Sequence, residues 1–377
     1  MKKTALLTLG RLPKALDVAH ALHGAGWRVI IAEPSKWHLS RVSRSVSKCV
    51  PVTAPNDNQA RYLADLLAII EDEGVSLVVP ISEEALHVTL IDRLLPEGVA
   101  LYSMPHEHIR QLHDKKKFIA LAASFGLPVP ETHQLGSDEA TCLAMRGAYI
   151  IKPICTCSGQ GLEICERGTS LPQLEARPPS VVQAFLDGAH KSSFSIAHKG
   201  RIIGTVVYRA RILSGTVAVA FERLNQETAI ENWIAIFAEK SNHSGFISFD
   251  FIEDAAGSPL AIECNPRATS GIHFVEPDDL ANAILNPAQQ FELKTKPFPT
   301  MQQFYPCLTE TQVAAFKGNQ FRDKLQVLMR SKDVSFSWRD PLPLWLMPFT
   351  AWSIIKRSMA KNESFGEAST HDIAWFE

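Results

Sequence analysis

The chain has 377 residues, more than one ordinary core holds, so we expect several domains around a cleft. Its composition, 46% hydrophobic and 21% charged, is that of a globular protein and excludes a disordered, collagenous or repeat-like chain. The formal net charge is -2, which excludes the strongly basic surface of a protein that coats nucleic acid. A local cluster of Lys and Arg that binds small anions stays compatible with this balance.

The first 100 residues alternate short β-branched runs with helical patterns. This alternation predicts a parallel sheet with crossover helices. Gly10 ends the first strand, whereas Gly24 and Gly26 close the first helix, so the glycines do not form the cluster of a dinucleotide-binding turn. Strands are expected at 6–9, 29–32 and 77–79, and helices at 13–23 and 57–71.

The middle of the chain begins with a charged helical stretch at 114–125 and a turn at 126–130, where two prolines stop the helix. Strands joined in meanders, with few crossover helices, predict an antiparallel α+β unit. Further strands are expected at 149–152, 162–165, 181–185, 192–198, 201–209, 217–222, 246–252 and 260–264, with a helix at 226–240.

The segment 297–377 carries many prolines and most of the tryptophans. The apolar run 342–355 is interrupted by Pro343 and Pro348 and is too short for a membrane span. We expect this tail to pack on the globule. The alternative is weak peripheral contact with a membrane surface through Trp345, Trp352, Lys356 and Arg357.

Seven cysteines are spread along the chain without the dense framework of a secreted disulfide scaffold, so a cytoplasmic location is expected. The apolar run after Met1 is cut short by Arg11 and Pro13, so we expect a first strand rather than a signal peptide. Cys155, Cys157 and Cys165 lack the usual spacing of a structural zinc site, and we expect them to be small fillers of their loop.

Acidic and amide side chains follow one another near the end of the strand pair 246–252 and 260–264. Asp250 and Glu263 sit among apolar neighbours, where an unpaired carboxylate is costly, so a cation or a strong donor is implied. Asn265 shares the face of Glu263, and such oxygen ligands suit Mg²⁺. Arg267 adds a planar fork for an anionic oxygen. Local salt bridges at strand ends are the alternative.

Lys152 ends a buried strand, and Ser158, Gly159 and Gly161 lie in the turn that follows. Backbone amides of such a loop can fold over phosphates while the lysine supplies a point charge. The lysine precedes the glycines, so this is not a Walker loop. A plain surface hairpin is the alternative.

In this order the motifs resemble the ATP-grasp superfamily over residues 1–280. The resemblance implies a fold of mixed α/β and α+β class: a Rossmann-like preceding domain and a two-part ATP-grasp fold. The boundaries expected are 1–113 for the Rossmann-like domain, 114–185 and 186–296 for the two ATP-grasp subdomains, and 297–377 for a C-terminal extension.

The resemblance also assigns the nucleotide site. It implies that ATP contacts Lys115 at an Asp-Lys helix start, with Lys116 and Lys117 as alternatives, and Lys152 on the strand. Adenine would lie against the hinge with Gln183 near its amino edge, beside Phe185 and Leu186. His190 stands where many relatives have a ribose-binding glutamate, which weakens any prediction of nucleotide preference. One Mg²⁺ on Asp250, a bridging Glu263 and a second ion on Asn265 are implied, and Mn²⁺ is an alternative metal.

The function implied is a ligase that activates a carboxylate as an acyl phosphate and joins it to an amine, with Lys152, Asn265 and Arg267 as catalytic residues. Small-molecule acid and amine substrates are expected where the halves meet, and a dimer is one candidate assembly. An ATP-grasp kinase and a non-catalytic ATP-binding module are the alternatives. The stretch 11–16 and the proline-rich extension are similar to a bacterial branch that includes mycosporine-glycine-type ligases. Substrate candidates are Glu83, Arg209, Arg211 and His273.

Overall fold

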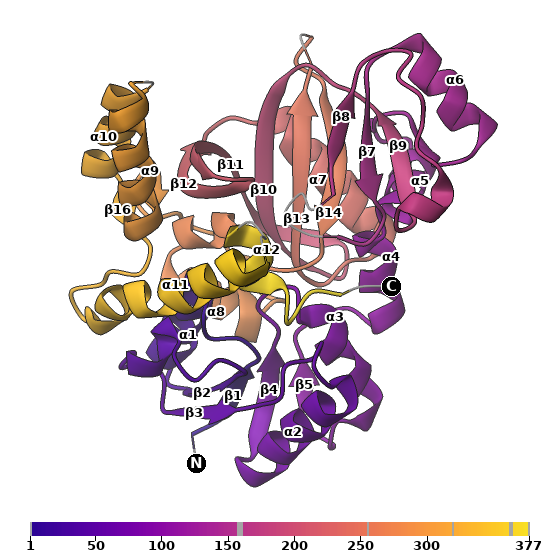
Figure 1. Ribbon diagram of the computed structural model, residues 1–377. Coiled ribbons are helices and arrows are strands. Elements are labelled where there is room, and N and C mark those ends of the chain that lie inside the picture. Colours follow the sequence, from indigo (N-terminus) through magenta and orange to yellow (C-terminus); the bar gives the residue numbers. More distant parts are fainter. Residues whose placement is uncertain (1, 157–160, 255, 319, 362–364, 376–377) are drawn as a thin grey trace.

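The computed structural model describes residues 2–156, 161–254, 256–318, 320–361 and 365–375. Three β-sheets organise these residues, and helices cover them (Figure 1). Ser158, Gly159 and Cys157 from the expected glycine loop lie outside the described residues.

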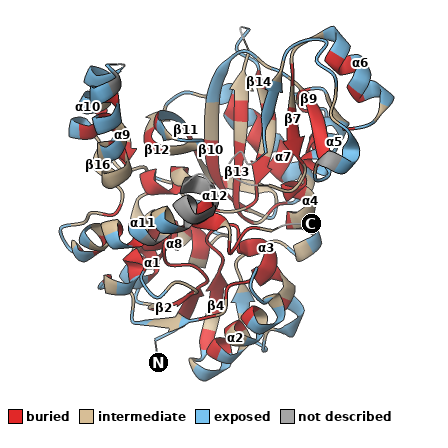
Figure 2. Cartoon of the chain, in the orientation of Figure 1, coloured by how far each residue is buried: buried red, intermediate tan, exposed pale blue. Residues whose placement is uncertain are grey.

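The N-terminal sheet is fully parallel, with the strand order β3-β2-β1-β4-β5, and it confirms the expected crossover topology. Its three inner strands β1, β2 and β4 are buried on both faces, as Figure 2 shows for β2 and β4. The short edge strands β3 and β5 were not predicted. The elements here are β1 (Thr4–Leu7), α1 (Pro13–Gly24), β2 (Arg28–Glu33), η1 (Leu39–Val42), β3 (Lys48–Pro51), α2 (Gln59–Asp72), β4 (Val75–Val79), α3 (Ala85–Val88), η2 (Thr89–Leu94), β5 (Ala100–Leu101) and α4 (His106–His113).

A four-stranded antiparallel sheet follows, in the order β6-β9-β7-β8. Asp114 caps α5 by accepting a hydrogen bond from the Lys117 backbone N–H at 2.9 Å, which fixes the start of that helix at Lys115. The elements are α5 (Lys115–Ser124), β6 (Thr132–Gln134), α6 (Asp138–Arg146), β7 (Tyr149–Pro153), β8 (Glu163–Cys165), η3 (Leu174–Ala176) and β9 (Ser180–Ala184). Of these, β6 and α6 were not predicted.

A seven-stranded sheet, in the order β14-β13-β10-β11-β12-β15-β16, forms the largest layer, and its first six strands pair antiparallel. One face packs against α5 and α7 through Phe118, Trp233, Phe237 and Phe249. The opposite face joins the core of the N-terminal sheet. The elements are β10 (Ala189–His198), β11 (Arg201–Ser214), β12 (Val217–Leu224), α7 (Thr228–Ser241), β13 (Gly245–Glu253), β14 (Pro259–Asn265), η4 (Ser270–Phe274) and α8 (Pro277–Leu285).

The C-terminal part is more integrated than a tail laid on the surface. Its strands β15 (Thr300–Gln302) and β16 (Lys332–Asp333) extend the seven-stranded sheet. Helices α9 (Phe304–Lys317) and α10 (Phe321–Arg330) stand beside that sheet, and α11 (Leu342–Lys361) and α12 (Phe365–Thr370) lie across the N-terminal sheet (Figure 1). Pro343 falls in the first turn of α11, where its missing N–H is tolerated, and the helix continues through Pro348.

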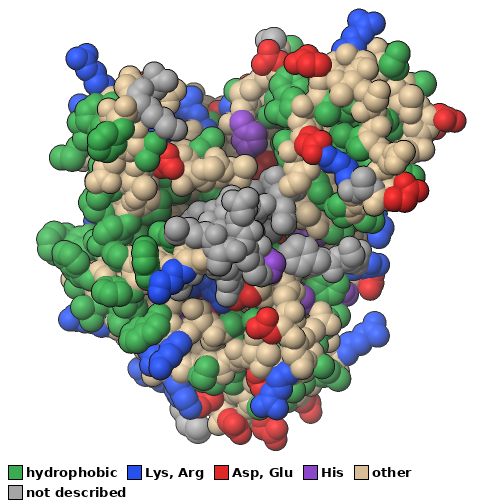
Figure 3. Space-filling view, in the orientation of Figure 1, with side chains coloured by type: hydrophobic (Ala, Val, Ile, Leu, Met, Phe, Trp, Pro, Cys, Tyr) green, Lys and Arg blue, Asp and Glu red, His purple; other side chains and the backbone are tan. Residues whose placement is uncertain are grey.

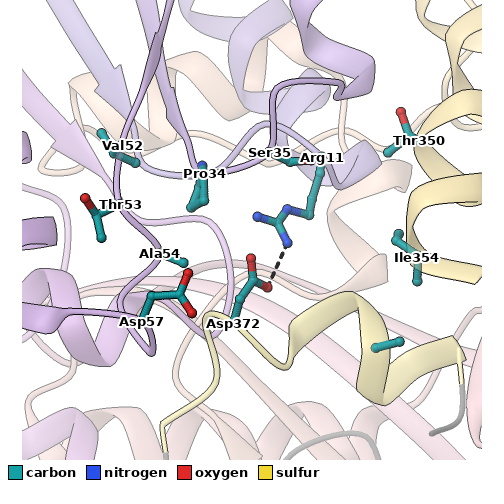
Figure 4. Close-up of a pocket in the computed structure, with 11 residues that line it drawn as sticks. Arg11, Pro34, Ser35, Val52, Thr53, Ala54, Asp57, Thr350, Ile354 and Asp372 are labelled. Carbon is teal, nitrogen blue, oxygen red and sulfur yellow. Dashed lines mark hydrogen bonds and ion pairs between the residues drawn. The ribbon is translucent and has the colours of Figure 1, made fainter. Parts of the chain in front are cut away.

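A buried ion-pair network fastens residue 372 to the N-terminal sheet. Arg11 contacts Glu33 through Nε at 2.8 Å and Asp372 through Nη1 at 2.8 Å. The Glu33 carboxylate also accepts the backbone N–H groups of Gly10 and Arg11, which positions the loop after β1. A cavity of about 280 Å³ lies beside this network, between the ends of the first strands and helices α11 and α12 (Figure 4).

Candidate active site

Three neighbouring strands place polar side chains in one row across the seven-stranded sheet. Ser192 on β10 pairs in register with Asp250 on β13, and Asp250 pairs with Glu263 on β14. Directly opposite residues of antiparallel strands point to the same face, so the three side chains meet. Ser192 Oγ donates to Asp250 Oδ1 at 2.5 Å, and Asn265 Nδ2 lies 3.2 Å from Asp250 Oδ2 and 3.3 Å from Glu263 Oε1. The hairpin predicted to present oxygen ligands is therefore formed.

The two carboxylates of this row influence each other's pKa. Burial and the neighbouring Glu263 raise the pKa of Asp250. Burial also disfavours ionised Glu263, but the positive charges of Lys115, Lys152 and Arg267 outweigh it and hold the pKa of Glu263 below its ordinary value. Two adjacent carboxylates that compete for positive charge are a donor set that suits a divalent cation.

Two lysines approach this row, and they come from different elements. Lys115 is the first residue of α5, and its Nζ lies 3.8 Å from Glu263 Oε2 and donates to the Thr156 carbonyl at 2.7 Å. Lys152 is buried on β7, and its Nζ donates to Gln183 Oε1 at 2.7 Å. Burial lowers the pKa of Lys152 to about 8 although Glu263 and Asp250 attract the charged form.

The helix start also distinguishes the three consecutive lysines. Lys116 Nζ is bound to Gln134 Oε1 at 2.6 Å, and Lys117 Nζ lies 3.4 Å from Asp114. Both side chains are exposed, whereas Lys115 is buried beside Glu263. Of the three, the geometry brings Lys115 to the carboxylate row.

Gly161 and the hinge segment after β9 have the following surroundings. Gly161, at the end of the loop, has φ +70°, and a Cβ there would lie 2.9 Å from Pro153 Cγ, so glycine suits this position. Gln183 on β9 is buried between Lys152 and the Thr132 hydroxyl, which accepts its Nε2 at 3.0 Å. Its side-chain amide is thus engaged within the protein. Phe185 follows as an exposed residue, with Leu186 half-buried beside it.

His190 and the arginine of the site have different surroundings. His190 is exposed on β10, two residues before Ser192 and so on the same face of the sheet. Arg267 forms a close ion pair with the buried Glu83, and its Nη2 also donates to Asn265 Oδ1 at 2.9 Å. Although burial opposes ionisation, Arg267 and the nearby His113 and Lys14 lower the pKa of Glu83. The N-terminal sheet therefore reaches the site through Glu83.

The remaining substrate candidates lie elsewhere. Arg209 and Arg211 on β11 are exposed and share Glu222 at 2.8 and 3.0 Å. Arg209 adjoins Tyr208, which pairs with Ser192, so alternation turns Arg209 to the face away from Asp250. His273 is buried against Asp17, with Nδ1 2.6 Å from Oδ2. This pair belongs to the packing of η4 on α1, since Lys296 also binds Asp17 at 3.0 Å.

Two residues of the site were missed from the sequence. Ser192 is found only through the strand register, because nothing near it in the chain marks a metal site. His113 ends α4 next to the capping Asp114, and it is buried with no hydrogen-bond partner for Nε2 among the described residues. Burial lowers the pKa of His113. Its position directly before the Asp-Lys helix start was the available signal.

The candidate metal ligands of the described residues are oxygen atoms rather than thiols. The described residues contain no group of three or more His, Cys, Asp or Glu side chains placed to hold a metal ion. Cys155 and Cys165 are not joined in a disulfide among the described residues, and Cys157 lies outside them. The oxygen ligands of the carboxylate row thus consist of Asp250 and Glu263, with Asn265 as a neutral third. Asn265 turns its Nδ2 to the carboxylates, so coordination through Oδ1 requires the amide to rotate.

Comparison with known proteins agrees with this geometry. Residues 112–271 match a family model described as an ATP-grasp domain. The arginine-specific large chain of carbamoyl phosphate synthase from Geobacillus stearothermophilus is 25% identical over 230 residues, which are 56% of this chain and 22% of that protein. The chain thus spans less than a quarter of the length of this curated relative.

Two solved structures show the same fold. N5-carboxyaminoimidazole synthetase from Staphylococcus aureus, also solved with ADP, superposes with a TM-score of 0.64 at 13% identity, over 86% of this chain and 87% of that one. L-amino acid ligase from Bacillus licheniformis gives 0.58 at 15% identity, over 76% and 74%. At these identities the likeness concerns the fold alone.

Residues 112–271 therefore match an ATP-grasp domain, and the resemblance seen in the sequence is confirmed for that part of the chain. The strand lysine, the helix-start lysine and the carboxylate row all lie within that range. The finer resemblance to mycosporine-glycine-type ligases is not confirmed by these matches.

Proposed function

We propose that this protein is an ADP-forming ligase that joins a carboxylate to an amine through an acyl phosphate. The observation that carries the proposal is the meeting of the Asp250–Glu263 carboxylate pair with Lys115, Lys152 and Arg267 at one cleft. A cation bound by the two carboxylates and the positive side chains beside them would together stabilise the negative charge of a transferring phosphoryl group. The names of the matched proteins, a synthetase and a ligase among them, support the same class.

The chemistry divides into two displacements. A carboxylate oxygen of the acid attacks the γ-phosphorus of ATP, the bond to the β-phosphate oxygen breaks, and ADP leaves. The amine nitrogen then attacks the acyl carbon, the bond to the phosphate oxygen breaks, and inorganic phosphate leaves with the excess proton passed to solvent. The first displacement provides the leaving group that a free carboxylate lacks, so no nucleophile from the protein is required.

The residues would take the following roles. Lys115 and Lys152 would bind phosphate oxygens, and Arg267 would balance charge on the transferring group. Asp250, Glu263 and the Asn265 carbonyl oxygen would hold two Mg²⁺ ions, with Mn²⁺ as an alternative, and the metal would neutralise phosphate charge when bound. The adenine would lie between the two sheets next to Phe185 and Leu186. Gln183 would act through Lys152, which it positions by the 2.7 Å hydrogen bond.

The acid and the amine are proposed to be small molecules held where Glu83 and Arg267 bring the N-terminal sheet to the cleft. Arg209, Arg211 and His273 are not part of this proposal, since their partners are Glu222 and Asp17. An arginine bound to a buried glutamate can exchange that partner for a substrate carboxylate.

The test uses hydroxylamine in place of the amine, because it traps acyl phosphates as hydroxamates. A library of carboxylic acids is incubated with the protein, ATP, Mg²⁺ and hydroxylamine, with the Glu263→Gln variant as a control. We expect a hydroxamate, ADP and phosphate with at least one acid. Release of AMP and pyrophosphate would overturn the mechanism. A phosphate ester without hydroxamate would show a kinase, and absence of any turnover across the library would favour a binding module.

A further inference from the structure

Helix α11 places its large apolar side chains outward. Leu342, Trp345, Phe349 and Trp352 are all exposed, with exposed fractions of 48, 67, 67 and 56%. Their spacing of three and four residues puts them on one stripe of the helix, and the exposed Lys356 continues it. The opposite side, which faces the protein, carries Pro343, Met347 and Thr350. The helix thus carries apolar side chains on its outer face as well as on the side that faces the protein.

Other exposed apolar side chains surround this stripe. Trp338, just before α11, is 85% exposed, and Trp37 lies beside η1, the element that packs against α11. Helices α9 and α10 add Phe316, Leu325 and Met329. Figure 3 shows that hydrophobic side chains gather along the edge of the molecule formed by α9, α10 and α11, at the left of that view. A patch of this extent marks a surface that contacts something other than water.

The exposed charges in the segment that contains the stripe, residues 331–356, are positive, although Asp323 is exposed on the neighbouring helix α10. Between residues 331 and 356 the acidic residues are Asp333 and Asp340. Asp340 is buried and accepts from Ser43 Oγ at 2.5 Å, and Asp333 accepts the Phe304 and Ser335 backbone N–H groups. Neither carboxylate therefore faces the solvent as a free charge, whereas Arg339 and Lys356 are exposed.

Cations also accompany the aromatic rings individually. Lys356 Nζ lies 5.6 Å from the centre of the Trp352 ring, and the Arg41 guanidinium lies 5.8 Å from that of Trp37. Lys332 is 4.9 Å from the Phe336 ring, which in turn contacts Trp338 at 5.0 Å. Tryptophan beside Lys or Arg is the combination that suits the interface of a bilayer, where rings reach the acyl boundary and cations meet headgroup phosphates.

We propose that the α11 stripe (Leu342, Trp345, Phe349, Trp352 and Lys356) docks this protein on the surface of a membrane that contains anionic lipid. In the described residues no helix has the length and apolarity required to cross a bilayer, so the contact is peripheral. Between residues 331 and 356 the positive charges of Arg339 and Lys356 are exposed and neither carboxylate is free, which favours an anionic surface over a second copy of the chain. In a two-fold dimer the same stripe would meet itself, and Lys356 would gain no acidic partner from the stripe of the second copy.

The experiment measures partitioning of the full chain onto large unilamellar vesicles by sedimentation. We expect binding to vesicles of phosphatidylcholine with phosphatidylglycerol, and at least about tenfold weaker partitioning to phosphatidylcholine alone or at high salt. The double variant Trp345→Ser/Trp352→Ser should weaken partitioning by about tenfold or more, because each indole withdraws a large apolar area from water. Arg339→Glu/Lys356→Glu should reduce binding to anionic vesicles and remove most of its salt dependence.

The matched control is Met145→Ser/Ile236→Ser, which alters two exposed apolar residues of α6 and α7, away from the stripe. This variant should partition as the wild type does, and circular dichroism should show every variant folded. Equal partitioning of wild type and the double tryptophan variant would overturn the proposal. A second result would also overturn it. In that result the wild type does not bind vesicles, and light scattering shows that the wild type is a dimer whereas the double tryptophan variant is a monomer.

Discussion

At the scale of single residues, the candidate site depends on one lysine held in an unfavourable environment. Lys152 is buried on β7, and desolvation lowers its pKa to about 8 although two carboxylates across the cleft attract its charge. The phosphates of ATP would bring negative charge close to Nζ and raise this pKa again. Binding of ATP is thereby linked to binding of a proton.

We predict proton uptake when ATP binds at pH 8 to 9. Free protein has lost part of the Lys152 proton in this range, since its pKa is about 8, whereas the complex keeps it. Calorimetric titrations in buffers of different ionisation enthalpy give the number of protons bound. Lys152→Ala should bind ATP more weakly, by about tenfold or more, and take up fewer protons. An unchanged ATP titration in that variant would contradict the phosphate-binding role.

Protonated Lys152 lowers the free energy of unfolding, whereas a protonated lysine in a salt bridge raises it. The folded pKa of Lys152 lies below the unfolded value, so the folded state binds fewer protons through this group as pH rises past 8. Its unfavourable contribution is present in full below that pH and disappears as pH approaches the unfolded pKa.

Glu263→Gln is predicted to lower ATP turnover by at least about a hundredfold while the protein stays folded. The substitution keeps the size of the side chain but removes the charge that Lys115, Lys152 and Arg267 share, and with it the proposed bridging metal ligand. Turnover is followed by phosphate release, and Glu222→Gln on the far face of the sheet serves as a control. Normal turnover in folded Glu263→Gln would refute the metal assignment.

The residues of the site show what sequence alone can and cannot decide. Asp250, Glu263, Asn265 and Arg267 were found because two strand ends close together in the chain carry them. Lys115 could not be separated from its two neighbours until the helix start showed which side chain is buried. Ser192 and Asp250 are 58 residues apart in the chain, and their contact depends on the register between β10 and β13. No local sequence pattern predicts that register.

At the scale of elements, the passage from the four-stranded to the seven-stranded sheet depends on Gly188. It directly precedes β10, and a Cβ there would lie 2.1 Å from the Glu253 carbonyl oxygen at the end of β13. No side chain fits in that space unless the backbone moves. The close approach of these two strand ends brings the hinge segment alongside the strands that carry Asp250 and Glu263.

We predict that Gly188→Ala lowers the free energy of unfolding by about 1–3 kcal/mol and weakens ATP binding. The methyl group would push β10 away from β13 next to the carboxylate row. Denaturant titration and calorimetry measure the two effects. Gly147→Ala is the matched control, because nothing lies within 4 Å of a Cβ there and its φ of -156° is open to alanine. If both variants show the same free energy of unfolding and the same ATP affinity, the close approach of Gly188 to Glu253 is not required for stability or for ATP binding.

Long strands and helices were predicted well because each carries its own hydrophobic period. The strands Arg28–Glu33 and Gly245–Glu253 differ from expectation only at their ends. Edge strands of two or three residues, such as Ala100–Leu101 and Thr132–Gln134, are too short to show a period and form only because a neighbour offers hydrogen-bond partners.

At the scale of the whole molecule, the C-terminal part connects the seven-stranded sheet to the N-terminal sheet. Its strand Thr300–Gln302 extends the seven-stranded sheet, and Asp372 binds Arg11 at the N-terminal sheet. Asn56 adds hydrogen bonds from Nδ2 to the carbonyl oxygens of His371 and Ala374, at 2.7 and 2.8 Å. No hydrophobic period in the sequence could predict that residue 372 would meet residue 11.

Arg11→Met is predicted to destabilise the protein by about 3–5 kcal/mol, because it leaves Glu33 and Asp372 buried without their shared cation. Hydrogen exchange should rise in residues 365–375 and in the loop after β1. Arg61→Met removes an exposed pair with Asp65 and should change stability by no more than about 0.5 kcal/mol. Equal effects of the two substitutions would contradict the fastening role of Arg11.

The pairing of Arg11 with Asp372 also bears on the order in which the protein is made. The two residues are 361 positions apart, and a ribosome that adds roughly 5 to 20 residues per second needs about 20 to 70 seconds between them. Throughout that interval the nascent N-terminal sheet holds Arg11 and Glu33 without their partner and without the helices that later cover them. Of the three described sheets, the one whose strands come earliest in the sequence is thus among the last to be completed, and its strand ends stay uncovered while most of the remaining residues are added.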